Sequence, residues 1–223
     1  MQKFDSPSPV TAVLDIPAGH IRFIAADRTD TCVEILPADK SKSRDLKAAE
    51  QTTVTYADGV LRIEAAAAKN RILGNSGSVE VTVQLPAGSR VEAKAAAAEL
   101  RGVGRLGDVT FEGAQAVVKL DETAGARLTL QAGDVLVGRL TGPAQISTQK
   151  GDLNIAEATS GTVELRTESG DITIGAARGT SATLDAGTAH GRIHNTLQNA
   201  EGTDAGLNIQ ATTSYGDITA RSL

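Results

Sequence analysis

The sequence has very few aromatic or reactive side chains. Aromatic residues make up 2% of its 223 residues, Trp is absent, and Cys32 is the single cysteine. One cysteine excludes an intramolecular disulfide, and so few rings remove the stacking platforms on which single-stranded nucleic acids bind. The core must therefore be filled by Val, Ile, Leu and Ala, and such small, uniform side chains suit a narrow, stacked interior.

Charge and hydropathy argue against two further kinds of partner. The formal net charge is -5 and the Lys and Arg residues are scattered, whereas binding to nucleic-acid phosphates needs a basic face. No apolar run approaches the roughly 20 residues of a membrane helix, and MQKFD at the N-terminus begins no signal-like apolar segment. We expect no nucleic-acid partner, no membrane insertion and a cytoplasmic location. A secreted protein whose signal had been removed would give the same pattern.

The first 88 residues predict irregular β-structure. Residues 1–12 resemble a polar lead-in, and 13–19 (VLDIPAG) predict a short strand and a turn. Residues 38–51 are rich in helix formers but have a sparse apolar stripe, so we interpret them as a loop or one helical turn. Two strands joined at Ala57-Asp58-Gly59 form a hairpin signal, at 52–56 and 60–65.

A polar loop at 69–77 and an alternating strand at 78–85 complete this region. Leu85-Pro86-Ala87-Gly88 echoes Ile16-Pro17-Ala18-Gly19, and an alternating strand follows in both places. We interpret the echo as a weak internal duplication.

A repeated unit organises the chain from about residue 89 onward. Its clearest copy is GTVELRTESGDITIG at 161–175, where Val163, Leu165, Ile172 and Ile174 alternate with polar residues around a Ser-Gly-Asp turn. This pattern predicts strand, tight turn, strand. Gly-Asp suits the turn because Gly accepts a positive φ and Asp hydrogen-bonds locally to the backbone.

Aligning the copies on their turn residue gives a ladder of equivalent positions, in steps of 18, 17, 18, 19, 21 and 25 residues. An aliphatic residue stands two positions after every turn residue. An apolar residue stands five positions before it, although in the sixth copy Leu184 fits only after a two-residue insertion. Thr148, Thr167, Glu164 and Arg166 are expected in turns or on the solvated face. The turn residues are Ala98, Ala116, Gly133, Gly151, Gly170, Gly191 and Gly216, followed by Leu100, Val118, Val135, Leu153, Ile172, Ile193 and Ile218.

This period is too short for a propeller blade and lacks the ladder of a leucine-rich repeat. It fits an all-β fold, a β-solenoid or single-stranded β-helix-like stack of about seven short coils, preceded by an irregular β-hairpin part. We therefore divide the chain into an N-terminal β region at 1–88, which caps the solenoid, and the repeat region at 89–223.

A solenoid exposes a bare strand layer at an end that nothing covers. The last coil, from Leu207 to Leu223, runs to the terminus without a cap sequence. Either the insertion at 195–206 folds over it or a second subunit does, so we expect a homodimer through this coil.

The turns AGDVLVG, KGDLNIA, SGDITIG and YGDITAR, with the PAG-led strand before them, resemble the DUF4097 family of bacterial β-strand-repeat proteins. The resemblance extends from VLDIPAG to the C-terminus. It implies a solenoid-like β domain with an adhesin-like role, often on envelope-associated chains, and it brings no family active site with it.

Candidate metal ligands are few. Asp134, Asp152, Asp171 and Asp217 follow turn glycines and could form a column, but Ca²⁺ needs several converging carboxylates and Arg192 breaks the series. We interpret these aspartates as turn-forming residues. His190 and His194 flank a turn glycine rather than sharing a helix face, with no HExxH motif and no Cys pair, so zinc binding is not supported.

Catalytic constellations are no better supported. Ser181, Asp185 and His190 supply the residue types of a hydrolytic triad without a nucleophile elbow or oxyanion hole. Asp121-Glu122 could suggest polysaccharide cleavage, but adjacent residues in a turn point apart. Cys32 stands in an alternating strand and is interpreted as a small buried hydrophobe. We assign no catalytic, cofactor-binding or metal-binding residue.

Three functional hypotheses follow. The favoured one is a non-enzymatic structural or protein-interaction module, which needs a broad β face or an exposed end. The second is a polysaccharide-binding or polysaccharide-active solenoid, which needs a groove with converging acids or aromatic rings. The third is a cytoplasmic regulatory partner protein.

Overall fold

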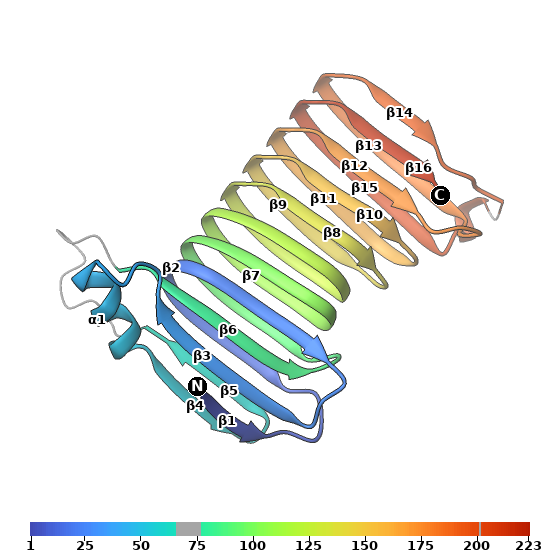
Figure 1. Cartoon of the computed structure of the whole chain (residues 1–223). Coiled ribbons are helices and arrows are strands. Elements are labelled where there is room, and N and C mark those ends of the chain that lie inside the picture. Colours follow the sequence, from blue (N-terminus) through green and yellow to red (C-terminus); the bar gives the residue numbers. More distant parts are fainter. Residues whose placement is uncertain (66–76, 201) are drawn as a thin grey trace.

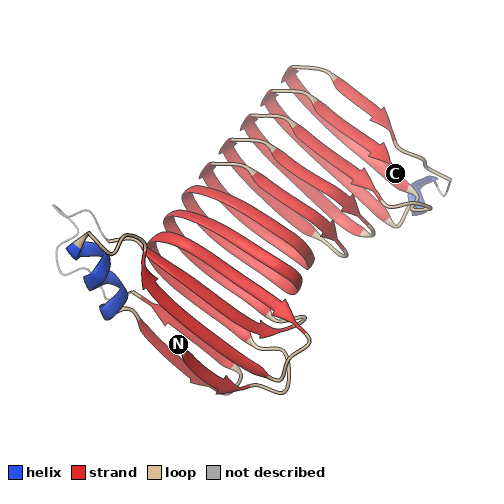
Figure 2. Cartoon of the chain, viewed as in Figure 1, coloured by secondary structure: helices blue, strands red, loops and turns tan. Residues whose placement is uncertain are grey.

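The computed structural model describes residues 1–65, 77–200 and 202–223 and forms a rod of stacked β-coils (Figure 1). Within these residues, helix is confined to short pieces near the two ends of the rod (Figure 2). In these ranges the elements are β1 (Gln2–Asp5), β2 (Thr11–Ala26), β3 (Asp30–Pro37), α1 (Ser43–Gln51), β4 (Thr53–Ala57), β5 (Val60–Glu64), β6 (Val79–Pro86), β7 (Arg90–Ala132), β8 (Val135–Leu140), β9 (Ala144–Lys150), β10 (Leu153–Ala158), β11 (Gly161–Ser169), β12 (Ile172–Ala176), β13 (Ala182–His190), β14 (Ile193–Thr196), η1 (Gly202–Asp204), β15 (Leu207–Tyr215) and β16 (Ile218–Ser222).

Successive coils pair in parallel and in the register that the repeat predicts. Val118 of β7 pairs with Val135 of β8, which pairs with Leu153 of β10. Leu153 in turn pairs with Ile172 of β12. The aliphatic position after each turn therefore forms one column along the rod. The predicted all-β solenoid is confirmed.

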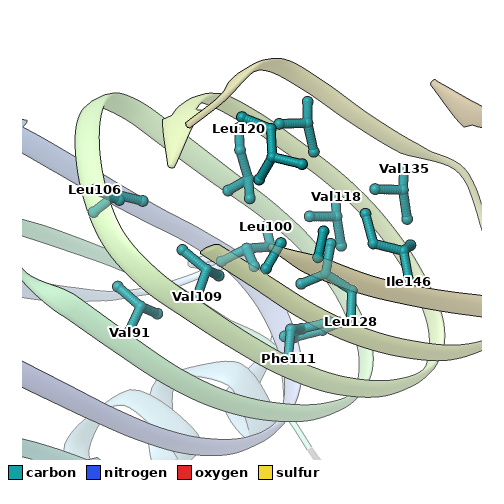
Figure 3. Close-up of a cluster of buried hydrophobic side chains, with 14 of the residues drawn as sticks. Val91, Leu100, Leu106, Val109, Phe111, Val118, Leu120, Leu128, Val135 and Ile146 are labelled. Atoms are coloured by element: carbon teal, nitrogen blue, oxygen red, sulfur yellow. The ribbon is translucent and has the colours of Figure 1, made fainter. Parts of the chain in front are cut away.

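The core is a set of such columns inside the rod. In Figure 3, Phe111, Leu128 and Ile146 come from successive coils, and all three are at most 1% exposed. Burying an aliphatic or aromatic side chain of this size contributes about 1.5–3 kcal/mol. Because each coil supplies only a few such residues, its stability comes from contact with its two neighbouring coils.

The turn glycines hold the coils at close approach. A Cβ at Gly151 would lie 2.1 Å from the carbonyl oxygen of Gly133, and one at Gly170 would lie 2.0 Å from that of Gly151. Both residues also have a positive φ, 143° and 153°, which L side chains rarely adopt. Gly is therefore required at residues 151 and 170 for two separate steric reasons.

Buried threonines strengthen the same turns, and here the expectation for Thr148 and Thr167 was wrong. They are 4% and 2% exposed, not solvated. The Thr167 hydroxyl donates to the carbonyl oxygen of Gly151 at 3.1 Å, and the Thr213 hydroxyl donates to that of Gly170 at 3.0 Å. Thr167 and Thr213 thus satisfy their own hydroxyl groups inside the core and each bridges two coils, whereas the Thr148 hydroxyl donates to the Lys150 carbonyl within its own coil at 3.3 Å. Glu164 and Arg166 are exposed, as predicted.

The coils do not stack in sequence order at the C-terminal end. β15 pairs in parallel with β11 on one edge and with β13 on the other. β16 likewise pairs with both β12 and β14. The coil at 207–222 is therefore inserted between the coils at 161–176 and 182–196, although it comes last in the chain.

This order corrects the expected interface. The coil from Leu207 to Leu223 is an internal layer, with Leu207, Ile209 and Ala211 at most 1% exposed, so it is not the bare end of the rod. The bare end is the coil formed by β13 and β14 (Figure 1).

The sixth copy needs no insertion. Ala186 pairs with Ala211, and Leu184 pairs with Ile209, the residue two positions earlier. Ala186 therefore occupies the position five residues before Gly191 that we had assigned to Leu184.

The first coil comes from the N-terminal region, where β2 pairs with β7 in parallel from Thr11↔Arg90 to Ala25↔Gly104. β2 continues through Pro17 instead of turning there. Its first half also pairs with β5 and its second half with β6, so Pro17 lies between the two ladders, where no N–H is required. Pro86 pairs with Ala26 and not with Pro17. The two Pro-Ala-Gly segments, at 17–19 and 86–88, therefore do not occupy equivalent places in the stack. The domain boundary expected at residue 88 stays a prediction, because the β2–β7 ladder joins residues on both sides of it.

The N-terminal end is closed by antiparallel strands. β1 pairs with β3, β3 with β6, and β4 with β5. The edge strands β1 and β4 meet through a stack of Phe4 on Tyr56, with ring centroids 5.1 Å apart. Asp30 binds the guanidinium of Arg28 at 2.7 Å and the ammonium of Lys3 at 2.9 Å, and these partners hold the pKa of its carboxyl well below the usual range.

Two N-terminal expectations are corrected and one is confirmed. Residues 1–12 are not only a lead-in, because they include β1, and 43–51 form the helix α1. The buried carboxylate of Asp45 in α1 accepts a hydrogen bond from the Ser78 N–H at 3.0 Å, which ties the helix to the start of β6. The hairpin is confirmed, with positive φ at Asp58 and Gly59. The loop predicted at 69–77 lies, except for its last residue, outside the described residues.

Replacing Gly170 with Ala should shift the urea unfolding midpoint strongly downward. The new Cβ would strike the Gly151 carbonyl and force a strained φ, a cost of about 3 kcal/mol. Gly187→Ala is the matched control, because a Cβ there meets nothing within 4 Å and its φ is not positive. Its effect should stay within about 0.5 kcal/mol. Equal effects of the two variants would contradict the close-approach account.

Candidate interaction surface

One face of the rod carries in-register rows of polar side chains. It is formed by the end of β7 with β9, β11 and β15. Arg127 pairs with Gln145, Gln145 with Glu164, and Glu164 with Gln210. We call this surface the polar face. Its residues are Arg127, Thr129, Gln145, Ser147, Gln149, Glu164, Arg166, Glu168, Gln210, Thr212 and Ser214.

The polar face has two adjoining shallow hollows. One has a volume of about 660 Å³ and reaches from Gln149 across β11 to Tyr215. The other, of about 590 Å³, reaches back to Arg127. Three side chains line both hollows, so the two form one continuous surface: Gln149, Arg166 and Glu168.

Charges of both signs alternate on this face, with Arg166 standing between Glu164 and Glu168 along β11. The Gln145 amide donates to the Glu164 carboxylate at 3.1 Å, which is the kind of cross-coil polar contact that orients an exposed row. Glu164 and Glu168 are four positions apart on the same strand, about 13 Å of chain. The paired carboxylates of most glycoside hydrolases lie about 5–10 Å apart, so these two do not form such a pair.

Tyr215 marks the end of the polar face. It is 60% exposed, and its ring stacks on the imidazole of His190 with centroids 4.7 Å apart and planes 12° from parallel. The two residues are paired across β15 and β13. Phe23 and Phe111, by contrast, are fully buried. This stack places an accessible aromatic surface beside the hollow that Glu168 and Arg166 line.

The predicted aspartate column exists and has a structural role. The Asp152 N–H donates to the Asp134 carboxylate at 2.9 Å, and the Asp171 N–H donates to that of Asp152 at 2.8 Å. The Asp217 N–H donates to Asp171 at 2.8 Å, and the Arg192 N–H donates to Asp217 at 2.8 Å. Each carboxylate therefore bonds the turn of the next coil.

Arg192 does not interrupt the column, which corrects our sequence interpretation. Because the coils at 182–196 and 207–222 are exchanged in space, Arg192 stands at the end of the series. Its guanidinium pairs with the Asp217 carboxylate at 3.0 Å. The backbone N–H of Arg192, and then its side chain, lower the pKa of Asp217.

The other candidate ligands and triad members are dispersed. His190 is at the end of β13, and exposed His194 is on β14. Ser181 is hydrogen-bonded to Asn199 at 3.0 Å, while Asp185 lies exposed on β13. Among the described residues no group of three or more His, Cys, Asp or Glu side chains is placed to hold a metal ion.

Cys32 is 8% exposed, and its sulfur accepts a hydrogen bond from the Arg28 guanidinium at 3.2 Å.

Asp121 and Glu122 lie within β7 and not in a turn, which corrects the sequence interpretation. Adjacent strand residues still point to opposite faces. The Asp121 carboxylate binds the Arg101 guanidinium and accepts from the Gly104 N–H at 3.2 Å, so it has structural partners.

Sequence reasoning missed the polar face as a site. The signal was present, because polar residues at alternate positions of 164–168 must point away from the core once the inward positions are known. The Tyr215–His190 stack could not be found in this way. The repeat alignment places the two residues in successive copies but does not show that they are direct neighbours.

The chain belongs to the Toastrack DUF4097 family, whose model matches residues 47–221. The resemblance identified from the turn motifs is thus confirmed. No curated protein matches the sequence. No helix in the described ranges is both long and apolar enough to cross a membrane.

Solved structures of similar overall form come from several bacteria. A candidate cell adhesion protein from Clostridium sporogenes is 13% identical, with 100% of this chain and 98% of that chain covered and a TM-score of 0.42. A candidate adhesin from Bacteroides fragilis is 10% identical, with 98% and 95% covered and a TM-score of 0.46. A candidate lipid binding protein from Parabacteroides distasonis is 12% identical, with 98% and 95% covered and a TM-score of 0.45.

Arg192→Ala should raise the pKa of Asp217 only part of the way to its ordinary value. The guanidinium is lost, but the backbone N–H, the larger cause, stays. In the wild type and in the variant, the Asp217 carboxyl adds folding stability at pH values above its unfolded-state pKa of about 3.9. That stability is lost as the pH falls through the folded-state pKa of Asp217. Carboxyl ¹³C chemical shifts followed against pH measure the change. A pKa unaffected by the substitution would contradict the ion pair.

Proposed function

We propose that the chain is a non-enzymatic binding module and that a protein partner docks on the polar face. The observation that carries this proposal is the set of in-register polar rows across β7, β9, β11 and β15, which join two shallow hollows into one surface. The stacked coils below make this surface rigid, so a partner would meet it with little ordering cost.

The dimensions and charges of the polar face suit a protein. Four neighbouring strands at ~4.8 Å spacing and about 25 Å in length cover on the order of 500 Å². A typical protein interface buries about 800 Å² on each partner. Arg127 and Arg166 alternate with Glu164 and Glu168, so a partner with the complementary order of charges is favoured over a uniformly charged polymer.

A non-enzymatic role is supported by the geometry of the acids and by the aspartate column. Glu164 and Glu168 stand apart along one strand, and the four column carboxylates are used by backbone N–H groups of neighbouring turns. The chemical groups that could have served catalysis thus have structural partners or no convergent neighbour.

A polysaccharide ligand is the second candidate, favoured by the exposed Tyr215–His190 stack at the edge of the larger hollow. An aromatic face beside hydrogen-bonding side chains combines an apolar platform with polar groups that fix orientation. This candidate predicts retention on immobilised polysaccharide in the absence of any other protein, whereas the first predicts none. A regulatory partner protein would be one case of the first.

Arg166→Glu should strongly reduce partner capture. The substitution creates three consecutive outward acids on β11 and reverses the charge at the centre of both hollows. Loss of a central charged contact should reduce retention at least about tenfold. The measurement is quantitative affinity capture from a lysate of the organism that encodes the chain, with wild type and variant compared at equal loading.

The matched control is Arg139→Glu, also an exposed arginine reversal but on β8, away from both hollows. A partner retained by wild type and the control, and lost with Arg166→Glu, supports the proposal. A partner retained equally by all three proteins would rule out the polar face as its binding surface.

A further inference from the structure

The coil formed by β13 and β14 exposes a cross-section of the solenoid core. Among the described strands, β13 pairs only with β15 and β14 only with β16, so the outer edges of both strands have no ladder partner. These strands form the last layer of the rod (Figure 1).

The exposure of equivalent residues shows how abruptly the core ends. Ile172 and Ile218 are both fully buried, whereas Ile193, the next residue in the same column, is 46% exposed. Leu184 and Ala186 are also only partly buried, although their β15 partners are at most 1% exposed. At Ile193, Leu184 and Ala186 no further coil of the described residues follows in the column.

The segment after β14 covers only the start of β13 at this end. There the Gln198 carbonyl accepts from the outward-facing Ala182 N–H at 3.1 Å, the Gln198 N–H donates to the Ser222 hydroxyl at 2.9 Å, and Leu197 packs against the core. The Ser181 hydroxyl accepts from the Ala200 N–H at 3.1 Å. Ile193 keeps its exposure with this segment in place.

The N-terminal end is built differently. Its inward residues Val33, Leu61 and Ile63 are at most 2% exposed, because β1, β4 and the Phe4–Tyr56 stack cover them. Short antiparallel edge strands discourage further pairing. The rod therefore has one covered end and one open end.

We propose that the open end binds the open end of a second copy of this chain, tail to tail about a two-fold axis. Homodimer interfaces resemble a domain core divided in two. The open end has this character, because inward-facing core residues are exposed there. A strand of nine residues and a two-sheet thickness with side chains give a footprint on the order of 600 Å². Two copies would bury about 1,200 Å², the lower limit for a stable specific interface.

Two further features select this arrangement. Because the other end is covered, head-to-tail growth is blocked and a two-fold contact closes the assembly. A two-fold axis perpendicular to the strands also sets β13 of one copy antiparallel to β13 of the other, so that the Asp185 half of one strand faces the His190 half of the other. This interface goes beyond the binding function proposed above and does not use the polar face.

The test is sedimentation velocity of the full chain over a concentration series. Wild type should be a dimer that dissociates on dilution. Ile193→Lys places a charge in the cut core of both copies and should weaken the dimer at least about 100-fold, with an unchanged circular dichroism spectrum. Leu136→Lys is the control, since Leu136 is 43% exposed on a mid-rod strand, and its dimer should match wild type. A wild-type protein that is monomeric even at the highest concentration of the series would overturn the proposal. So would a dimer that Ile193→Lys does not weaken.

A cross-link distinguishes the two-fold contact from any other self-association. Gly187, near the middle of β13, has open space for a side chain. In a Cys32→Ser background, Gly187→Cys should form a disulfide-linked dimer under mild oxidation, because only a two-fold axis brings residue 187 beside its own copy. Absence of the covalent dimer in a protein that still associates, or association into larger species, would contradict the tail-to-tail arrangement.

Discussion

The in-register parallel ladder between successive coils is the interaction on which the rest of the structure depends. The turn glycines approach the carbonyl of the preceding coil, the buried threonines donate to that carbonyl, and the aspartates accept from the next turn. All three contacts exist only when neighbouring coils are in the same register. Stability is therefore a sum over neighbouring layers, and each layer depends on the one beside it.

This dependence explains why the exchanged coils matter. The coil at 182–196 has no ladder to the coil at 161–176 and is held by β15 and β16, which come later in the chain. The last segment of the sequence thus fastens the layer that precedes it. The same exchange completes the aspartate column, brings Tyr215 onto His190 and leaves Ile193 at the open end.

The repeat was predictable because inward positions alternate with polar ones and turn glycines recur at nearly constant spacing. Register followed directly, as the Val118, Val135, Leu153 and Ile172 column shows. The stacking order was not predictable, because every coil carries the same inward pattern and can follow any other. The polar face was recognisable in principle from residues 164–168. The Tyr215–His190 stack and the place of Arg192 depend on the order alone.

The most direct measurement is therefore disulfide trapping of that order. In a Cys32→Ser background, Glu164→Cys with Gln210→Cys joins adjacent register partners, about 4.8 Å apart and within disulfide reach. Glu164→Cys with Asp185→Cys joins strands separated by β15, about 10 Å apart and too far. We predict rapid oxidation within monomers of the first pair only. Efficient bonding of the second pair and none of the first would show that the coils stack in sequence order, contrary to this account.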